Sequence, residues 1–200
     1  MRRLFIVFEG VDGAGKSEIS AKVSKIIGAT HLESPINEFK KIRQYGDLNL
    51  NDKGRFLFYL ASNFDLSNYV CKQRLNKTIV CARYFHSTMI GYASRQGLDI
   101  EDFYESPPVS LHDLEKPDIT IFLYVNEEVQ RKRIESREFN GNSPTDYKCL
   151  NDEIYRKSLF KNYCSISIKE NWINIDTSSM SVDEVVNECV QKVSQNDVFF

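Results

Sequence analysis

The chain has 200 residues, with 26 Lys and Arg against 28 Asp and Glu and a formal net charge of −2. This length predicts a single domain over residues 1–200, and the balanced charge excludes a protein that holds nucleic acid through a strongly basic surface. Because 42% of the residues are hydrophobic, the chain is not expected to be disordered.

Neither the cysteines nor the apolar runs indicate export or a membrane span. The five cysteines lack the short paired spacings of zinc and redox motifs. The first apolar run, residues 4–8, ends at Glu9, whereas the apolar part of a signal peptide needs about seven residues or more. No other run reaches the roughly 18 apolar residues of a membrane helix. We therefore expect a cytoplasmic protein with no membrane partner.

The predicted elements alternate between strands and helices. Residues 4–8 have the continuous apolar character of a strand that is buried on both faces. After a glycine-rich turn, apolar residues recur at helical spacing up to Gly28, and Glu33 follows a second strand. Further helices are expected at residues 37–45, 52–75, 127–137, 152–168 and 182–193, and further strands at residues 78–81, 119–125 and 172–175. Residues 139–147 are the most loop-like internal stretch. This order predicts an α/β fold, a five-stranded parallel sheet with helices on both faces.

The glycine-rich turn carries the strongest chemical signal. Its residues are Gly10, Val11, Asp12, Gly13, Ala14, Gly15, Lys16 and Ser17. They match the pattern G-x-x-x-x-G-K-S/T between a predicted strand and a predicted helix, which is the context of a phosphate-binding P-loop. Backbone amides and the helix N-terminus would hold the phosphates of ATP, Lys16 would neutralise the β and γ oxygens, and the Ser17 hydroxyl would bind Mg²⁺. A chance glycine-rich turn is the alternative.

Length and composition narrow the class of P-loop protein. A chain of 200 residues has no room for an ATPase lid domain, and the sequence lacks an obvious Asn/Thr-Lys-x-Asp stretch for reading guanine. A small phosphotransferase is the class that fits best.

Segments elsewhere in the chain follow the pattern of one family. They are residues 57–63, Ala82-Arg83-Tyr84 followed by Ser87, residues 116–120, and the pair Arg133 and Arg137. Together with residues 8–17, they resemble the thymidylate kinase family of nucleoside monophosphate kinases over nearly the whole chain. The resemblance implies a P-loop NTPase-type fold with a short lid at about residues 137–148. It also implies transfer of the γ-phosphoryl group of ATP to a nucleoside monophosphate, with Mg²⁺, and a homodimer.

The same resemblance implies roles for individual residues. ATP would be bound by the eight loop residues together with Arg133 and Asp176. The acceptor would be bound by Asp12, Glu33, Arg43, Phe58, Asn63, Arg83, Ser87 and Tyr92, with Arg43 and Arg83 gripping its phosphate. Catalysis would depend on Lys16, Asp12, Arg83, Arg133 and Arg137, and Mg²⁺ would be held by Ser17 and Glu9. Arginine suits this chemistry because its planar guanidinium binds phosphate oxygens bidentately.

Purely structural roles remain open for several of these residues. Arg133 and Arg137 also fit an exposed helical face that pairs with Glu135 and Glu138. Asp12 also fits a turn in which its carboxylate caps backbone amides, and Asp176 fits a helix cap or a turn.

The aromatic residues of the predicted helix at residues 52–75 favour packing over chemistry. Phe58 and its aromatic neighbours are more typical of a core or a dimer contact than of a base-stacking platform. His86 lies close to Arg83 in sequence, but a packing histidine is the favoured interpretation.

The family pattern is broken at three places. Ala82 replaces the acid that normally ends this strand near Mg²⁺, and a methyl group holds no metal. Asn63 stands where the family has an arginine that reads the acceptor base. Met89, Gly91 and Tyr92 replace residues that would line a thymine pocket. A buried site that lacks a hydrogen-bonding partner loses selectivity, so a thymine acceptor is not assured.

These departures leave three hypotheses. The first is a nucleoside monophosphate kinase with an altered base preference, whose acceptor phosphate is already ionised and needs no strong base. The second is a deoxynucleoside kinase, whose hydroxyl acceptor needs a base such as Glu33. The third is a nucleotide-binding protein that retains the loop but has lost turnover.

Overall fold

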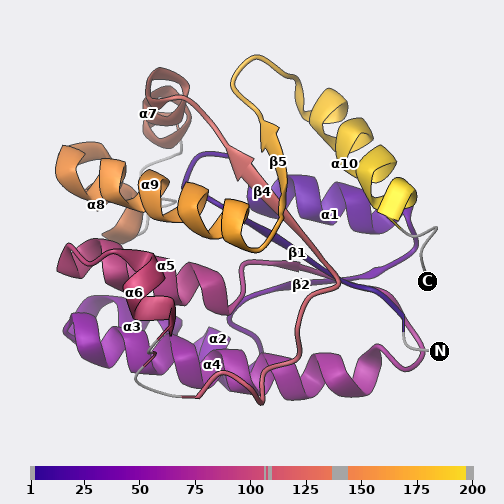
Figure 1. Cartoon of the computed structure of the whole chain (residues 1–200), viewed down its shortest axis with the longest axis horizontal. Helices are drawn as coiled ribbons and strands as arrows, with labels where there is room; N and C mark the ends of the chain where they lie inside the picture. The colour runs from indigo at the N-terminus through magenta and orange to yellow at the C-terminus, as the bar shows by residue number, and fades with distance from the viewer. Residues whose placement is uncertain (1–2, 106, 108–109, 137–143, 197–200) are drawn as a thin grey trace.

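The computed structural model describes residues 3–105, 107, 110–136 and 144–196. Their strands form one parallel sheet with the order β2-β3-β1-β4-β5 (Figure 1). The strands are β1 (Phe5–Gly10), β2 (Thr30–Glu33), β3 (Ile79–Ala82), β4 (Ile119–Tyr124) and β5 (Ile173–Asp176). The predicted α/β fold with a five-stranded parallel sheet is therefore confirmed.

Helices cover both faces of this sheet. On one face lie α1 (Lys16–Ile26) and α10 (Val182–Asn196), which pack against each other (Figure 1). On the other face lie α4 (Asp52–Gln73), α5 (Phe85–Gln96) and α9 (Glu153–Lys169), and α5 packs against both of its neighbours. The shorter helices are α2 (Asn37–Lys41), α3 (Arg43–Asn49), α6 (Ile100–Glu105), α7 (Glu127–Glu135) and α8 (Pro144–Asn151).

Strand β1 lies in the middle of the sheet, between β3 and β4. Its residues Phe5 to Phe8 are completely buried, as expected of a strand with neighbours on both edges and helices on both faces. Because the strands are parallel, β1 delivers the glycine-rich loop to the same edge at which β3 and β4 end.

The structure differs from the sequence prediction between residues 37 and 49. The single helix predicted at residues 37–45 is two helices, α2 and α3, because Ile42 leaves helical geometry with φ −97° and ψ 6°. The first ends with Lys41, and the second runs on to Asn49.

Three helices that the sequence did not predict are α5, α6 and α8. Helix α5 contains His, Ser, Thr, Gly and Tyr, which are weak helix formers. Its buried Phe85, Met89 and Ala93 nevertheless recur at helical spacing, and that signal was available in the sequence. The stretch at residues 139–147 was predicted as a loop, but α8 begins at Pro144. Proline is over-represented at the first helical position, and that signal was available in the sequence. The predicted lid at residues 137–148 falls partly on residues 137–143, outside the described residues, and partly on α8.

The five cysteines are free thiols in this structure. Within the described part of the chain, no helix combines the length and the apolar character needed to span a membrane.

His86 is a packing residue, in agreement with the favoured interpretation of the sequence. Its ring lies tilted against that of Phe85, with centroids 3.9 Å apart, and is edge-to-face with the ring of Trp172, with centroids 4.8 Å apart. Its Nε2 lies 3.2 Å from the Tyr104 hydroxyl, and its buried Nδ1 has no hydrogen-bond partner among the described residues. Burial lowers the pKa of His86 from 6.5 to about 3, because the imidazolium would have to leave water.

We predict that His86 makes the protein less stable in mild acid. In the unfolded chain its ring takes up a proton below pH 6.5, whereas in the folded chain it stays neutral until the pH approaches about 3. The free energy of unfolding should therefore fall across this window by up to ~1.4 kcal/mol per pH unit. Urea unfolding of His86→Phe and of the wild type is measured at pH 7, 5.5 and 4.5. The difference between their free energies of unfolding should change with pH. Parallel curves would contradict the prediction.

Candidate functional site

The glycine-rich loop leaves β1 through a very close backbone approach. Gly10 has φ +145°, and a Cβ built on it would lie 1.9 Å from the carbonyl oxygen of Leu123 in β4. Gly13 and Gly15 also have positive φ, at +83° and +88°. The loop conformation is therefore accessible to glycine at these positions and strongly unfavourable for other residues.

The loop presents the groups that a polyphosphate requires. Helix α1 begins at Lys16, and no side chain caps its N-terminus, because the N-cap residue is Gly15. The N-terminus of a helix attracts anions through its backbone N–H groups. Lys16 Nζ donates to the carbonyl oxygen of Val11 at 2.6 Å and lies 3.9 Å from Asp12 Oδ1. Ser17 is exposed at the loop. Loop amides, an ammonium group and an exposed hydroxyl are thus close in sequence at the start of α1, and they are the groups that the phosphates of ATP with Mg²⁺ require.

Residues behind the loop hold its backbone. Gln130 of α7 donates from Nε2 to the carbonyl oxygen of Asp12 at 2.7 Å. Arg133 donates to Gly13 O at 3.3 Å, to Thr177 Oγ1 at 2.9 Å and to Thr177 O at 2.7 Å. Arg133 therefore ties the loop to the segment that follows β5, next to the ATP-binding space.

Asp176 lies at the end of β5 and accepts a hydrogen bond from the Ser178 backbone at 2.9 Å. This contact is the turn geometry that the sequence left open as the alternative.

Glu9 is completely buried and acts as an acceptor for the segment after β3. Its carboxylate accepts from the backbone N–H groups of Tyr84 at 3.0 Å and Ser87 at 3.2 Å, and from the Ser87 hydroxyl. Burial raises the pKa of Glu9, and these donors act in the opposite direction. The carboxylate is thus engaged with α5, which leaves Ser17 as the better placed of the two metal candidates. In the part of the chain that the structure describes, no group of three or more His, Cys, Asp or Glu side chains is arranged to hold a metal.

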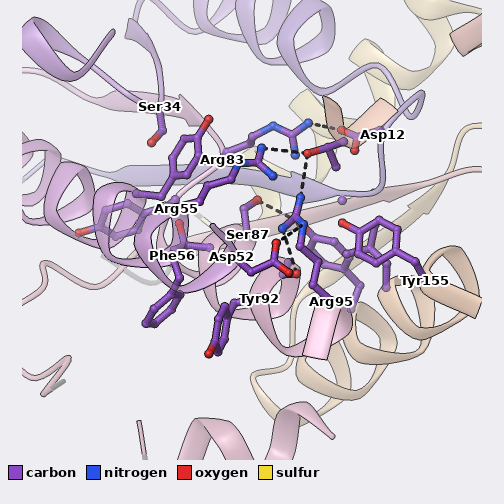
Figure 2. Close-up of a pocket in the computed structure, with 18 of the residues that line it drawn as sticks. Asp12, Ser34, Asp52, Arg55, Phe56, Arg83, Ser87, Tyr92, Arg95 and Tyr155 are labelled. Atoms are coloured by element: carbon purple, nitrogen blue, oxygen red, sulfur yellow. Dashed lines mark hydrogen bonds and ion pairs between the residues drawn. The ribbon is translucent and has the colours of Figure 1, made fainter. Parts of the chain in front are cut away.

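A pocket lies beside the loop, enclosed by α4, α5, α8 and α9 (Figure 2). Its polar lining includes Asp12, Ser34, Arg43, Asp52, Arg55, Tyr59, Arg83, Tyr84, Ser87, Thr88, Tyr92, Arg95, Thr145, Tyr155 and Tyr163. Figure 2 shows Arg55 and Arg83 pointing toward the same space from one side, and Arg95 and Tyr155 from the other. Because Gly10 and Asp12 also line it, the pocket opens beside the phosphate loop.

Arg83 connects the two spaces. Its backbone adopts a left-handed conformation with φ +68°, which is uncommon for a residue with a side chain. Its Nη2 donates to Asp12 Oδ1. Burial alone would lower the pKa of Arg83, but the neighbouring Asp12 carboxylate outweighs it and the pKa rises. The guanidinium is therefore permanently charged, beside both the loop and the pocket.

The residues predicted to bind the acceptor are only partly brought together. Arg43, Arg83, Ser87 and Tyr92 line the pocket along with Asp12.

Three other predicted acceptor residues lie elsewhere. Among the described lining residues of the pocket, neither Glu33 nor Phe58 appears, and Phe58 packs against Phe39 with centroids 5.5 Å apart. Asn63 lies behind the lining, where its Nδ2 donates to Thr88 Oγ1 at 2.9 Å. The predicted catalytic residue Arg137 lies outside the described residues.

The pocket residues that sequence reasoning missed include Arg55, Arg95, Thr145 and Tyr155. They come from α4, α5, α8 and α9, and no short motif links them. The available signal was weak, because Arg55 and Tyr59 lie four residues apart on the predicted helix and so share a face.

Comparisons with known proteins identify a matching family, a sequence relative and two structures of similar fold. The sequence model of the family described as thymidylate kinase matches residues 8–189. A probable thymidylate kinase of Methanocaldococcus jannaschii is 30% identical over 191 residues, which cover 94% of each chain. A thymidylate kinase structure from Candida albicans superposes with a TM-score of 0.74 at 20% identity, over 98% of this chain and 93% of that one. A deoxyadenosine kinase structure from M. mycoides superposes with a TM-score of 0.66 at 24% identity, over 96% of this chain and 100% of that one. At these identities the two structures establish likeness of fold.

We predict that Gly10→Ala is far more damaging than Gly28→Ala. Both residues have positive φ, but a Cβ at Gly10 meets Leu123 O at 1.9 Å, whereas a Cβ at Gly28 meets nothing within 4 Å. The strain at Gly28 should cost about 1–2 kcal/mol, and the clash at Gly10 on the order of 3 kcal/mol more. Thermal unfolding should place Gly10→Ala roughly 10 °C below Gly28→Ala. Equal melting temperatures would show that β1 and β4 separate easily at this point.

Proposed function

The chain belongs to the thymidylate kinase family, whose members are nucleoside monophosphate kinases, and on that premise we propose that its pocket takes a nucleoside 5′-monophosphate rather than a nucleoside. The γ-phosphoryl group would pass from ATP in the glycine-rich loop to the phosphate of the acceptor. The reaction forms a bond from an acceptor phosphate oxygen to the γ phosphorus and breaks the bond to the β-phosphate oxygen of ATP, giving ADP and a nucleoside diphosphate.

The charge of the pocket supports an anionic acceptor. Four arginines line the described part of the pocket, against the two lining aspartates and Asp47 behind them, which pairs with Arg43 and Arg55. This leaves a surplus of one positive charge. A phosphate monoester carries about −1.5 to −2 charge at pH 7, so the acceptor would balance this surplus. A neutral nucleoside would leave it uncompensated in a partly buried space.

The loop residues would position ATP. Lys16 and the amides of the loop would hold the β and γ phosphates, and Arg83 beside Asp12 would stabilise the charge where the two phosphates meet. Mg²⁺, with Ser17 as its proposed protein ligand, would neutralise charge on the β and γ oxygens. An ionised phosphate is already a nucleophile, so the methyl group of Ala82 is compatible with this reaction.

The deoxynucleoside kinase hypothesis is less well supported. Its proposed base, Glu33, is exposed at the end of β2 and lies outside the described lining of the pocket. We also propose that the protein acts in the cytoplasm, where thiols stay reduced and ATP is available.

A panel assay tests the proposed reaction. Purified protein is incubated with Mg-ATP and each common nucleoside monophosphate and nucleoside, and products are separated by chromatography. We expect nucleoside diphosphate from at least one monophosphate, and the panel also identifies the base. Lys16→Met should lower turnover by roughly 100-fold or more, since it removes a cation from the transferred group.

The matched control is Lys25→Met, on the exposed last turn of α1, which should leave turnover unchanged. Product from nucleosides alone would establish the deoxynucleoside kinase instead. Binding of Mg-ATP with no product from any acceptor would establish a nucleotide-binding protein without turnover.

A homodimer through α4 is the second part of the proposal. Leu57 on this helix is 45% exposed, and Leu75 just beyond its end is also exposed, so both apolar side chains are available to contact a second copy. We expect light scattering to give a dimer mass for the wild type and a monomer mass for Leu57→Asp. The control Ile154→Asp changes an exposed apolar residue of α9 and should remain dimeric. A monomeric wild type would contradict this part of the proposal.

A further inference from the structure

Two arginines that no motif predicted converge on one oxygen in the pocket. Arg55 of α4 and Arg95 of α5 both donate from Nη2 to Thr145 Oγ1 of α8, at 3.0 and 2.9 Å. Their side chains are only 13% and 12% exposed. Two guanidinium groups held this close repel each other unless negative charge lies between or beside them.

A carboxylate pairs with each of these arginines. Asp47 accepts from Arg55 Nε at 2.8 Å and from the Tyr59 hydroxyl at 2.8 Å. Asp52 lies 3.7 Å from Arg95 Nε. These contacts fix the orientation of the two guanidinium groups, and Arg55 and Arg95 both line the pocket.

The Arg95 guanidinium lies beside the backbone of Gly91. Arg95 Nη1 donates to the Gly91 carbonyl oxygen at 3.1 Å, and a Cβ at Gly91 would lie 3.4 Å from the same nitrogen. The guanidinium therefore lies close along the backbone of its own helix, facing the pocket.

Tyr155 supplies an independent observation that points to a ligand. Its side chain lines the same pocket and is only 3% exposed, yet its hydroxyl has no hydrogen-bond partner among the described residues. The Arg95 guanidinium lies 5.4 Å from the centre of its ring. Burial raises the pKa of Tyr155, so the group remains an O–H donor at neutral pH. A buried donor without a partner is costly, and a bound acceptor group would satisfy it.

The convergence point lies close to the phosphate loop. Thr145 and Cys149 are four residues apart on α8 and therefore share a face. Cys149 Sγ lies 3.8 Å from Asp12 Oδ2. The two arginines thus meet about one helical turn from the Asp12 carboxylate, in the region where an acceptor phosphate would face ATP.

We propose that Arg55, Arg95 and Tyr155 bind the phosphate of the acceptor. This inference rests on the proposed function and deepens it, because it assigns the acceptor phosphate to side chains from α4, α5 and α9 in addition to Arg83. The Thr145 hydroxyl accepts from both arginines, which leaves its own proton to donate to a phosphate oxygen. The acceptor is recognised here as a phosphate monoester, whatever its base.

Binding measurements separate recognition of the phosphate from recognition of the nucleoside. Calorimetry is run with dTMP, dCMP, dAMP and dGMP and with their parent nucleosides. Arg55→Gln and Arg95→Gln should each weaken binding of the monophosphate that the wild type binds best by about 10- to 100-fold. Binding of the parent nucleoside should stay unchanged. Arg55→Lys and Arg95→Lys keep the charge and should lose less.

Tyr155→Phe gives a readout that a structural role would not produce. The variant should bind the monophosphate about 3- to 10-fold more weakly. Its melting temperature should equal that of the wild type or rise, because a buried hydroxyl without a partner is removed. Arg3→Gln, an exposed arginine just before β1, is the matched control and should change neither measurement.

The outcomes distinguish this inference from the proposed reaction. Equal loss of monophosphate and nucleoside binding in the arginine variants, or no loss, would overturn the inference. Selective loss of the monophosphate in a protein that shows no turnover would support the phosphate site and overturn the proposed reaction. A wild type that binds no monophosphate would overturn both.

Discussion

The arrangement of this site depends on one buried carboxylate. Glu9, near the end of the central strand, accepts from the backbone N–H groups of Tyr84 and Ser87 at the start of α5. No side chain within α5 caps that helix, so a residue from a distant strand satisfies its N-terminus and complements its dipole. Burying a carboxylate is expensive, and these donors offset much of that cost. The contact locks β1 to α5, and it therefore sets the position of the glycine-rich loop relative to the pocket.

The connection between β3 and α5 follows from this contact. Arg83 is left in a left-handed conformation between two anchored segments, with its guanidinium against Asp12. Strain of this kind persists where the surroundings hold it, and it is common at functional sites. Gly10 contributes in another way, because the absence of its side chain lets the backbone of β4 lie close to the start of the loop. Backbone geometry on both sides of the loop thus brings a cation and a phosphate cradle to one edge of the sheet.

The pocket shows how a family architecture accommodates altered residues. Asn63, which stands where the family has a base-reading arginine, is satisfied by Thr88 behind the lining. Arginines from other positions, Arg55 and Arg95, provide positive charge within the pocket instead. Their carboxylate partners and the hydroxyl of Thr145 keep the cations apart from water and correctly oriented. Part of the positive charge of this pocket therefore comes from side chains that the family pattern did not predict.

The sequence alone determined the sheet, its strands and the phosphate loop, because these depend on local patterns: apolar runs, helical periodicity and glycines at fixed spacing. Only the tertiary structure decided the pocket. Helix α5 has weak propensity and takes its cap from Glu9, more than seventy positions away. Arg55, Arg95, Thr145 and Tyr155 meet across four helices, and Glu33 and Phe58 fall outside the lining that their positions suggested. Such contacts are set by how helices pack on the sheet, and a one-dimensional pattern carries no record of that packing.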